Sequence, residues 1–267
     1  MTVGDWHESV ARCDTCHDHR MAVVPGASEL LDPPEVGRQF RADRKVRLGD
    51  VDPSGQLRLD ATARYLQDIA GDDASGAELD GAWGWVVWRS MIEVRQPAVL
   101  DEVVTVTTYC TGVGRSWAER TTILAGSLGA DIATVSVWVQ VAADTGRPAA
   151  LTQQFVDTYG SACGGRKVSA RLTLAAPTDS DGAIPWSVRR ADLDPFEHVN
   201  NAANWAFVEE SLNGMGPRRG RAEMEFVGPV MHGTNVQSVT ESTDGVRSMW
   251  LLNEGSVLSA ARWSPVD

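Results

Sequence analysis

Apolar residues recur along the chain at two different spacings, which predict two helices among many strands. The first helix is expected over residues 59–73, where apolar side chains follow the helical period. These side chains are Tyr65, Leu66, Ile69 and Ala70. The second helix is expected after Asn200, up to Leu212, and is apolar on nearly every side. Such a helix must be wrapped by other structure, because solvent would leave Trp205 and Phe207 unburied.

Segments in which apolar and polar residues alternate predict two groups of strands. In the first half we expect strands over residues 44–51, 85–94, 102–111, 116–124 and 131–141. In the second half we expect strands over residues 186–190, 221–226, 235–241, 247–253 and 257–263. One long helix followed by an antiparallel meander predicts an α+β fold, in which a sheet curls around the helix.

The order of these elements divides the chain into two domains. Residues 1–36 contain several prolines and no sustained apolar period, so we interpret them as a flexible leader. A first domain is then expected over residues 37–155 and a second over residues 184–267. Residues 156–183 contain two loop-like stretches with Gly and Pro and are the expected linker.

The two halves repeat each other in sequence. Asp50-Val-Asp-Pro-Ser-Gly-Gln-Leu57 aligns without a gap with Asp192-Leu-Asp-Pro-Phe-Glu-His-Val199. Farther on, and in the same order, Glu93-Val-Arg-Gln-Pro97 aligns with Glu225-Phe-Val-Gly-Pro229. Two matches in the same order predict that the chain contains two copies of one unit, each a helix in a sheet.

Composition and charge exclude several classes of protein. The chain has 267 residues and a formal net charge of −12, which argues against a general nucleic-acid binder. No apolar run approaches the ~18 residues of a membrane-spanning helix. Residues 1–20 are polar and lack the apolar core of a signal peptide. We therefore expect a cytoplasmic protein without a membrane span.

The sequence predicts neither a metal site nor a cofactor. Cys13, Cys16, His17 and His19 are metal ligands by residue type, but they lie in one short segment and no second pair follows. Four cysteines are too few for a disulfide framework in a chain of this length. Neither a Gly-x-Ser-x-Gly elbow nor a phosphate loop nor a dinucleotide fingerprint occurs, so serine hydrolases and nucleotide-binding proteins lack support.

Candidate chemistry is concentrated in the turn before the second helix. This turn carries Asp194 and His198, so a carboxylate and an imidazole lie where the helix N–H groups have no intrahelical partners. Asp194 could attack a polarised carbonyl or orient water, and His198 could orient that water or transfer protons. The alternative is that Asp194, Asn200 and Asn201 only cap the helix, with His198 packed in the interface.

The repeat and the pattern Asp-x-Asp-x-x-x-His-Val-Asn-Asn over residues 192–201 resemble the acyl-acyl carrier protein thioesterases. The resemblance covers about residues 40–265, and Trp85-Val-Val-Trp88 and Gly114-Arg-Ser-Trp117 also fit it. It implies two tandem hotdog domains, each a long helix wrapped by an antiparallel β-sheet. It also implies hydrolysis of fatty acyl thioesters of acyl carrier protein to free fatty acids.

Carried onto this chain, the resemblance makes Asp194 and His198 the catalytic pair. Asp192, Asn200 and Asn201 become supporting residues. The acyl chain is expected mainly in the first domain, so the resemblance implies substrate contacts there from Asp52, Trp85 and Trp88. Asp52 is the first-half equivalent of Asp194, and its turn resembles the active-site turn of the 4-hydroxybenzoyl-CoA thioesterase branch.

Two positions depart from the plant enzymes of the family. Phe196 stands where those enzymes have Asn, and Pro229 lies where a further catalytic carboxylate is expected. The catalytic set is thus incomplete by this comparison. An acyl-CoA thioesterase of the same fold and a catalytically silent acyl-binding protein are therefore kept as alternatives.

The expected partner is acyl carrier protein or a CoA thioester. Arg218, Arg219 and Arg221 form a basic cluster that could dock an acidic carrier protein, and solvated surface is the alternative interpretation. The sequence is also compatible with a homodimer.

Overall fold

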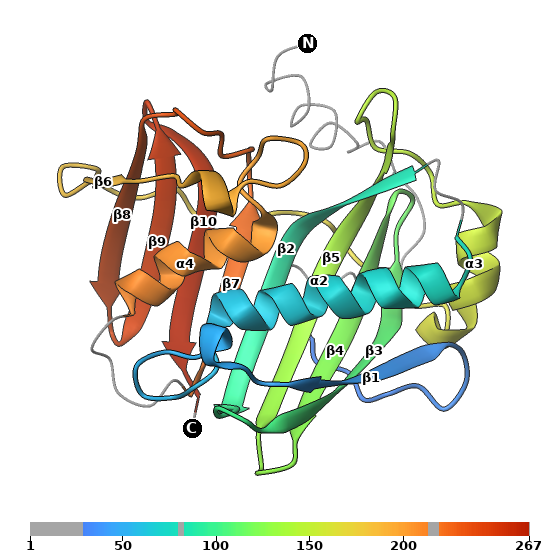
Figure 1. Ribbon diagram of the computed structural model, residues 1–267. Coiled ribbons are helices and arrows are strands. Elements are labelled where there is room, and N and C mark those ends of the chain that lie inside the picture. Colours follow the sequence, from blue (N-terminus) through green and yellow to red (C-terminus); the bar gives the residue numbers. More distant parts are fainter. Residues whose placement is uncertain (1–28, 80–82, 213–218, 267) are drawn as a thin grey trace.

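A computed structural model describes residues 29–79, 83–212 and 219–266 of the chain. Within these residues, the strands form one ten-stranded sheet in the order β1-β3-β4-β5-β2-β7-β10-β9-β8-β6, with every neighbour antiparallel (Figure 1). The α+β prediction is confirmed. No helix of the described part is long and apolar enough to cross a membrane.

Each half contains one long helix after its first strand. The first half consists of β1 (Gln39–Lys45), α2 (Leu59–Gly76), β2 (Trp83–Gln96), β3 (Val103–Val113), β4 (Trp117–Gly126) and β5 (Asp131–Ala142). The second consists of β6 (Ile184–Trp186), α4 (Asn201–Ser211), β7 (Gly220–Phe226), β8 (Val236–Thr243), β9 (Val246–Asn253) and β10 (Ser256–Pro265). Strand order is β1-β3-β4-β5-β2 in one half and β6-β8-β9-β10-β7 in the other. The predicted repeat is therefore confirmed.

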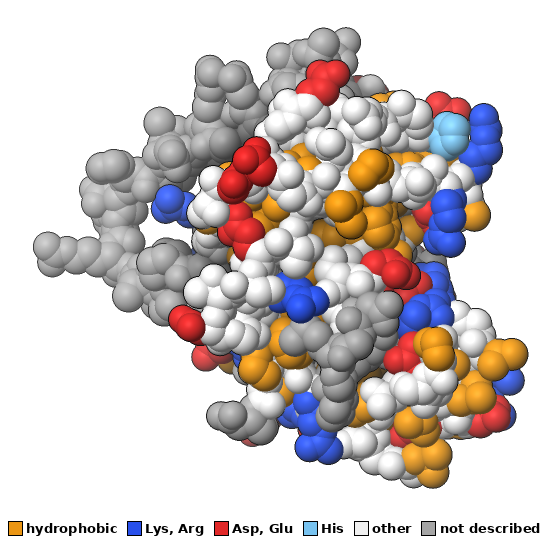
Figure 2. Space-filling view, turned by 90° about the vertical axis from the view of Figure 1, so that its left-hand side faces the viewer, with side chains coloured by type: hydrophobic (Ala, Val, Ile, Leu, Met, Phe, Trp, Pro, Cys, Tyr) orange, Lys and Arg blue, Asp and Glu red, His pale blue; other side chains and the backbone are white. Residues whose placement is uncertain are grey.

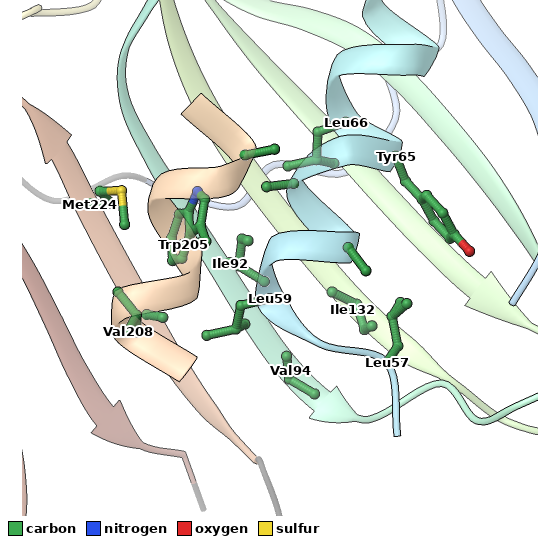
Figure 3. Packing of buried hydrophobic residues seen from close by; sticks show 14 of the residues in the cluster. Leu57, Leu59, Tyr65, Leu66, Ile92, Val94, Ile132, Trp205, Val208 and Met224 are labelled. Carbon is green, nitrogen blue, oxygen red and sulfur yellow. The ribbon is translucent and has the colours of Figure 1, made fainter. Parts of the chain in front are cut away.

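The halves join edge to edge, because β2 pairs with β7. Helices α2 and α4 lie side by side against the same face of the joined sheet (Figure 1). Trp205 of α4 and Met224 of β7 pack with Ile92 of β2 in one core, and all three are at most 1% exposed (Figure 3). Trp205 and Phe207 are buried, which confirms that α4 is wrapped by other structure.

The repeat extends to the hydrogen bonds of the turn before each helix. Asp52 Oδ1 accepts from the backbone N–H groups of Ser54 and Gln56, at 2.8 and 3.0 Å. Asp194 Oδ1 accepts from the equivalent N–H groups of Phe196 and His198, at 2.9 and 3.2 Å. The same carboxylate-closed turn therefore precedes α2 and α4.

The strands predicted at 44–51 and 186–190 are wrong in position. β1 and β6 lie earlier, and each is followed by a short 3-10 helix, at Leu48–Asp50 and Arg190–Asp192. The cause is the carboxylate that ends each 3-10 helix, because Asp50 and Asp192 accept the N–H groups of Arg47 and Arg189 and close the chain into a turn.

A further helix, α3 (Gln153–Tyr159), spans the start of the expected linker, and a 3-10 helix, Gly160–Cys163, follows it. Thr152 caps α3 by accepting from the N–H of Phe155 at 3.1 Å. Phe155 and Tyr159, four residues apart, bury one side of this short helix. The predicted border between residues 155 and 156 falls inside α3.

Residues 169–175, which follow these helices, form hydrogen bonds to strands of both halves of the sheet. The guanidinium of Arg89 on β2 donates to the carbonyl oxygens of Ser169 and Arg171, both at 2.9 Å. Trp250 of β9 donates through Nε1 to the carbonyl of Ala175 at 2.8 Å. The middle of the predicted linker is therefore fixed to the sheet by hydrogen bonds.

Candidate functional site

A cavity of about 1000 Å³ extends from the start of α4 into the first half of the molecule. The turn before α4, the start of α4 and the segment after β7 line one part of it. Helix α2, strands β2 to β5, the loop after β5 and helix α3 line most of the rest. The cavity therefore belongs to both halves.

Four predicted site residues meet at the second-half part of this cavity: Asp194, His198, Asn200 and Asn201. Asn204, which lies on the same face of α4 as Asn201, also lines the cavity and is 5% exposed. Asn204 was not predicted from the sequence, although its spacing of three residues from Asn201 places both on one helical face. This part of the cavity combines a carboxylate, an imidazole and three amide side chains.

Two of these side chains, Asn200 and Asp194, accept hydrogen bonds from backbone N–H groups. Asn200 caps α4, since its Oδ1 accepts from the N–H of Ala202 at 2.8 Å. Asp194 Oδ1 closes the turn that presents His198, as Asp52 Oδ1 does in the first half. Only Asp194 of these two aspartates lines the cavity, so the turn does not account for its position there.

The remaining predicted residues lie in different places. Asp192 does not line the cavity and forms an ion pair with Arg189 at 2.6 Å, which supports the turn from outside. Phe196 lines the cavity and is 78% exposed, so it lies at the rim. Pro229 lines the cavity as well. Among the described residues, the cavity-lining carboxylates are Asp194 and Glu119, and the latter belongs to β4.

The first-half part of the cavity follows a stripe of small residues on α2. Gln67, Ala70, Gly71 and Ala74 lie at the spacing of one helical face, and all four line the cavity. A Cβ atom at Gly71 would have no neighbour within 4 Å. Of the three predicted substrate contacts, Trp85 and Trp88 line the same space and Asp52 does not. The small stripe is visible in the sequence but was missed.

Farther along α2 lies a buried group of charged and polar side chains. Asp73 is 1% exposed and binds Arg38 at 2.6 Å and Arg120 at 2.7 Å. The hydroxyl of Tyr159 donates to Asp73 Oδ2 at 2.9 Å, and burial raises the pKa of this tyrosine. The guanidinium of Arg120 also lies 5.3 Å from the centre of the Tyr159 ring. Arg120 and Tyr159 line the cavity.

Two of the three predicted docking arginines bind side chains of β2. Arg221 bonds Glu93 on β2 at 2.5 and 2.9 Å, and Arg219 donates to Gln96 at 2.5 Å. Arg218 lies outside the described residues, as do Cys13, Cys16, His17 and His19. On the face shown in Figure 2, Lys and Arg side chains are interspersed with Asp and Glu. The described residues form no single large basic patch on that face.

Two family models match the chain in sequence order. Residues 37–159 match the acyl-ACP thioesterase N-terminal domain, and residues 176–259 match the acyl-ACP thioesterase C-terminal domain. The two matches correspond to the two halves of the sheet.

Individual proteins agree with these matches. An uncharacterised protein of Mycobacterium tuberculosis is 31% identical over 87% of this chain and 94% of its own length. Oleoyl-acyl carrier protein thioesterase 1 of Arabidopsis thaliana is 27% identical over 72% of this chain and 61% of its own length. The 12:0-ACP thioesterase of Umbellularia californica has the same double hotdog fold, with a TM-score of 0.70 at 20% identity over 85% of this chain and 98% of that one.

Proposed function

The chain belongs to the acyl-ACP thioesterase family, and from that premise we propose that it hydrolyses fatty acyl thioesters of acyl carrier protein to free fatty acids. One observation carries the proposal: Asp194 and His198 line the same cavity that continues along α2 into the first half. A thioester carbonyl at the start of α4 can then have its acyl chain in the first-half part of the cavity.

Each group has a role in this reaction. Through the carboxylate oxygen that does not close the turn, Asp194 either orients a water that attacks the carbonyl carbon while His198 takes its proton, or attacks the carbon itself. In the second case a water then hydrolyses the acyl-aspartyl anhydride, which releases the fatty acid and restores the carboxylate. As the carbon–sulfur bond breaks, His198 delivers a proton to the leaving thiolate. The amides of Asn201 and Asn204, together with the positive end of the α4 dipole, stabilise the negative charge on the carbonyl oxygen.

The repeat supplies matched controls for a test of these roles. Asp194→Asn keeps an oxygen that can close the turn, and His198→Ala removes only the imidazole. Asp52→Asn and Gln56→Ala make the same changes at the equivalent positions of the first-half turn, which lies outside the cavity. We expect kcat/KM to fall about 10²-fold or more for the first two variants and to stay near wild type for the controls.

The assay measures thiol release from acyl carrier protein and acyl-CoA substrates, with thermal unfolding as a check on folding. Faster release from acyl-CoA would identify an acyl-CoA thioesterase. A wild-type protein that binds fatty acids but hydrolyses neither substrate would be a silent acyl-binding protein, and the proposal would fall. Equal loss of activity in all four variants would show that the turns act only through folding.

We propose that Arg218, Arg219 and Arg221 contribute to docking of the acidic carrier protein. Attraction between exposed charges is screened by salt, so KM for the carrier-protein substrate should rise with ionic strength. Arg219→Ala should raise KM for that substrate and leave KM for acyl-CoA unchanged. A KM independent of salt would count against this docking surface.

A further inference from the structure

We propose that the inner end of the cavity binds an acyl chain that ends in a hydrogen-bond-accepting oxygen, as a hydroxyl or a carboxylate does, in preference to a plain methyl end. Hydrolysis of thioesters of such chains rests on the proposed thioesterase function, whereas binding of the chains does not. The inference depends on Arg120, a guanidinium of the first half that lines the cavity.

Arg120 lies at the inner end of the path that an acyl chain would take. The cavity lining follows α2 from Gln67, near the start of α4, to Ala74. This distance is about 10 Å at the rise of an α-helix. Asp73 precedes Ala74 and binds Arg120, and the hydroxyl of Tyr159 donates to Asp73. Helix α3, which carries Tyr159, lies beside the end of α2 (Figure 1). The lining continues from Ala74 to Leu79, so a chain of sufficient length that extends from Asp194 and His198 along α2 reaches Arg120.

The charges at this end do not cancel. Asp73 is a single buried carboxylate, and both Arg38 and Arg120 bind it. The neighbouring carboxylate, Glu119, is bound by its own partner, Arg166. Among the described residues of this cluster one positive charge is left over, which favours a ligand group with negative charge or an oxygen lone pair.

Arg120 also has donors to offer. Its hydrogen bonds to described residues run through Nη1, to Asp73 at 2.7 Å and to Thr108 at 3.2 Å. A guanidinium carries five N–H donors, and 13% of this side chain is exposed. A methyl end would displace water from these donors and bond none of them, at a cost of about 1–3 kcal/mol. An oxygen would accept a charge-assisted hydrogen bond instead.

A purely structural ion pair does not explain this arrangement. Asp73 and Arg38 alone would neutralise each other, and Arg38 does not line the cavity. Arg120 adds a second cation, and it is this one that lines the cavity. The excess charge therefore lies on the side where a ligand would be.

The test compares three thioesters of equal chain length: the plain acyl chain, its ω-hydroxy analogue and its ω-carboxy analogue. We expect kcat/KM to be at least about tenfold higher for one of the two oxygenated chains, which also identifies the preferred group. In parallel, calorimetry measures binding of the three corresponding free acids to the full chain. This second readout needs no catalysis, so it tests the inference even if no thioester is hydrolysed and the proposed function fails.

Two variants connect the preference to Arg120. The double variant Asp73→Asn with Arg120→Leu removes the lining cation without leaving its carboxylate buried and unpaired, and should reduce the preference to about onefold. Arg38→Gln removes the surplus charge but leaves the N–H donors of Arg120 in place, so it should weaken the preference for a carboxylate end and keep the preference for a hydroxyl end. Equal or tighter binding of the plain acid by wild type would overturn the inference, whether or not the double variant folds.

Discussion

Filling the cavity at Gly71 should shorten the acyl chain that the protein accepts. Gly71 lines the first-half part of the cavity, and a Cβ atom there would have no neighbour within 4 Å. Because Gly71 is part of the cavity lining, we expect the side chain of Gly71→Leu to extend into the space that the acyl chain would occupy. Its four carbon atoms should exclude about as many methylene groups of a long substrate.

Each excluded methylene loses about 0.8 kcal/mol of burial, so the longest accepted chains lose about 3 kcal/mol. This corresponds to a fall in kcat/KM of about 100-fold, since about 1.4 kcal/mol is a factor of ten. Shorter chains that end before Gly71 should be unaffected. Replacing a helical glycine with leucine should also stabilise α2 by up to about 1 kcal/mol, so lost activity would not come from unfolding.

The assay is kcat/KM over a series of saturated acyl thioesters. Ser75→Leu is the control, because Ser75 lies on α2, is exposed and does not line the cavity. A Gly71→Leu profile that matches that of Ser75→Leu would refute the placement of the acyl chain along α2. A uniform loss for all chain lengths would refute it as well.

Three further predictions concern stability. Asp73→Ala leaves two arginines without their buried carboxylate and should cost about 3–5 kcal/mol, a fall in Tm of about 6 °C or more; a shift within error would contradict this. Asn200→Ala removes the α4 cap and should cost about 1 kcal/mol in denaturant unfolding, while Asn200→Ser should cost less. Burial alone would raise the pKa of Asp50, but hydrogen bonds from Tyr65, a backbone amide and Arg64 outweigh it and lower this pKa. The carboxylate therefore stabilises the fold above its ordinary pKa, and this contribution is lost as the pH falls through the lowered one. Asp50→Asn should be less stable than wild type at neutral pH, with the difference shrinking in acid; a pH-independent difference would argue against it.

The sequence alone predicted the duplicated fold well because its signals are local. The turns at Asp52 and Asp194 depend on side chains that bond N–H groups only a few residues away. Their similarity was therefore visible as a repeat. The first strand was misplaced because Asp50 closes a 3-10 helix, a preference that alternation of apolar residues does not report.

The inner end of the cavity could not be predicted in the same way. Asp73, Arg120 and Tyr159 come from α2, β4 and α3, which are far apart in the chain. Their meeting depends on how the sheet curves and on where α3 docks, and neither is encoded in a short pattern. Each residue alone has the appearance of an ordinary surface position.

The antiparallel pairing of β2 with β7 has a consequence for the origin of this chain. β2 is the last strand in the order of the first half and β7 is the last in the order of the second, and these two strands face each other. A free first half would expose an unpaired β2 edge, which is a template for another chain. A second copy, related by a two-fold axis, could cover it in the arrangement that β7 has here. The duplicated protein thus resembles a symmetric dimer whose two subunits have been joined, with a histidine in one turn and a glutamine at the equivalent position of the other.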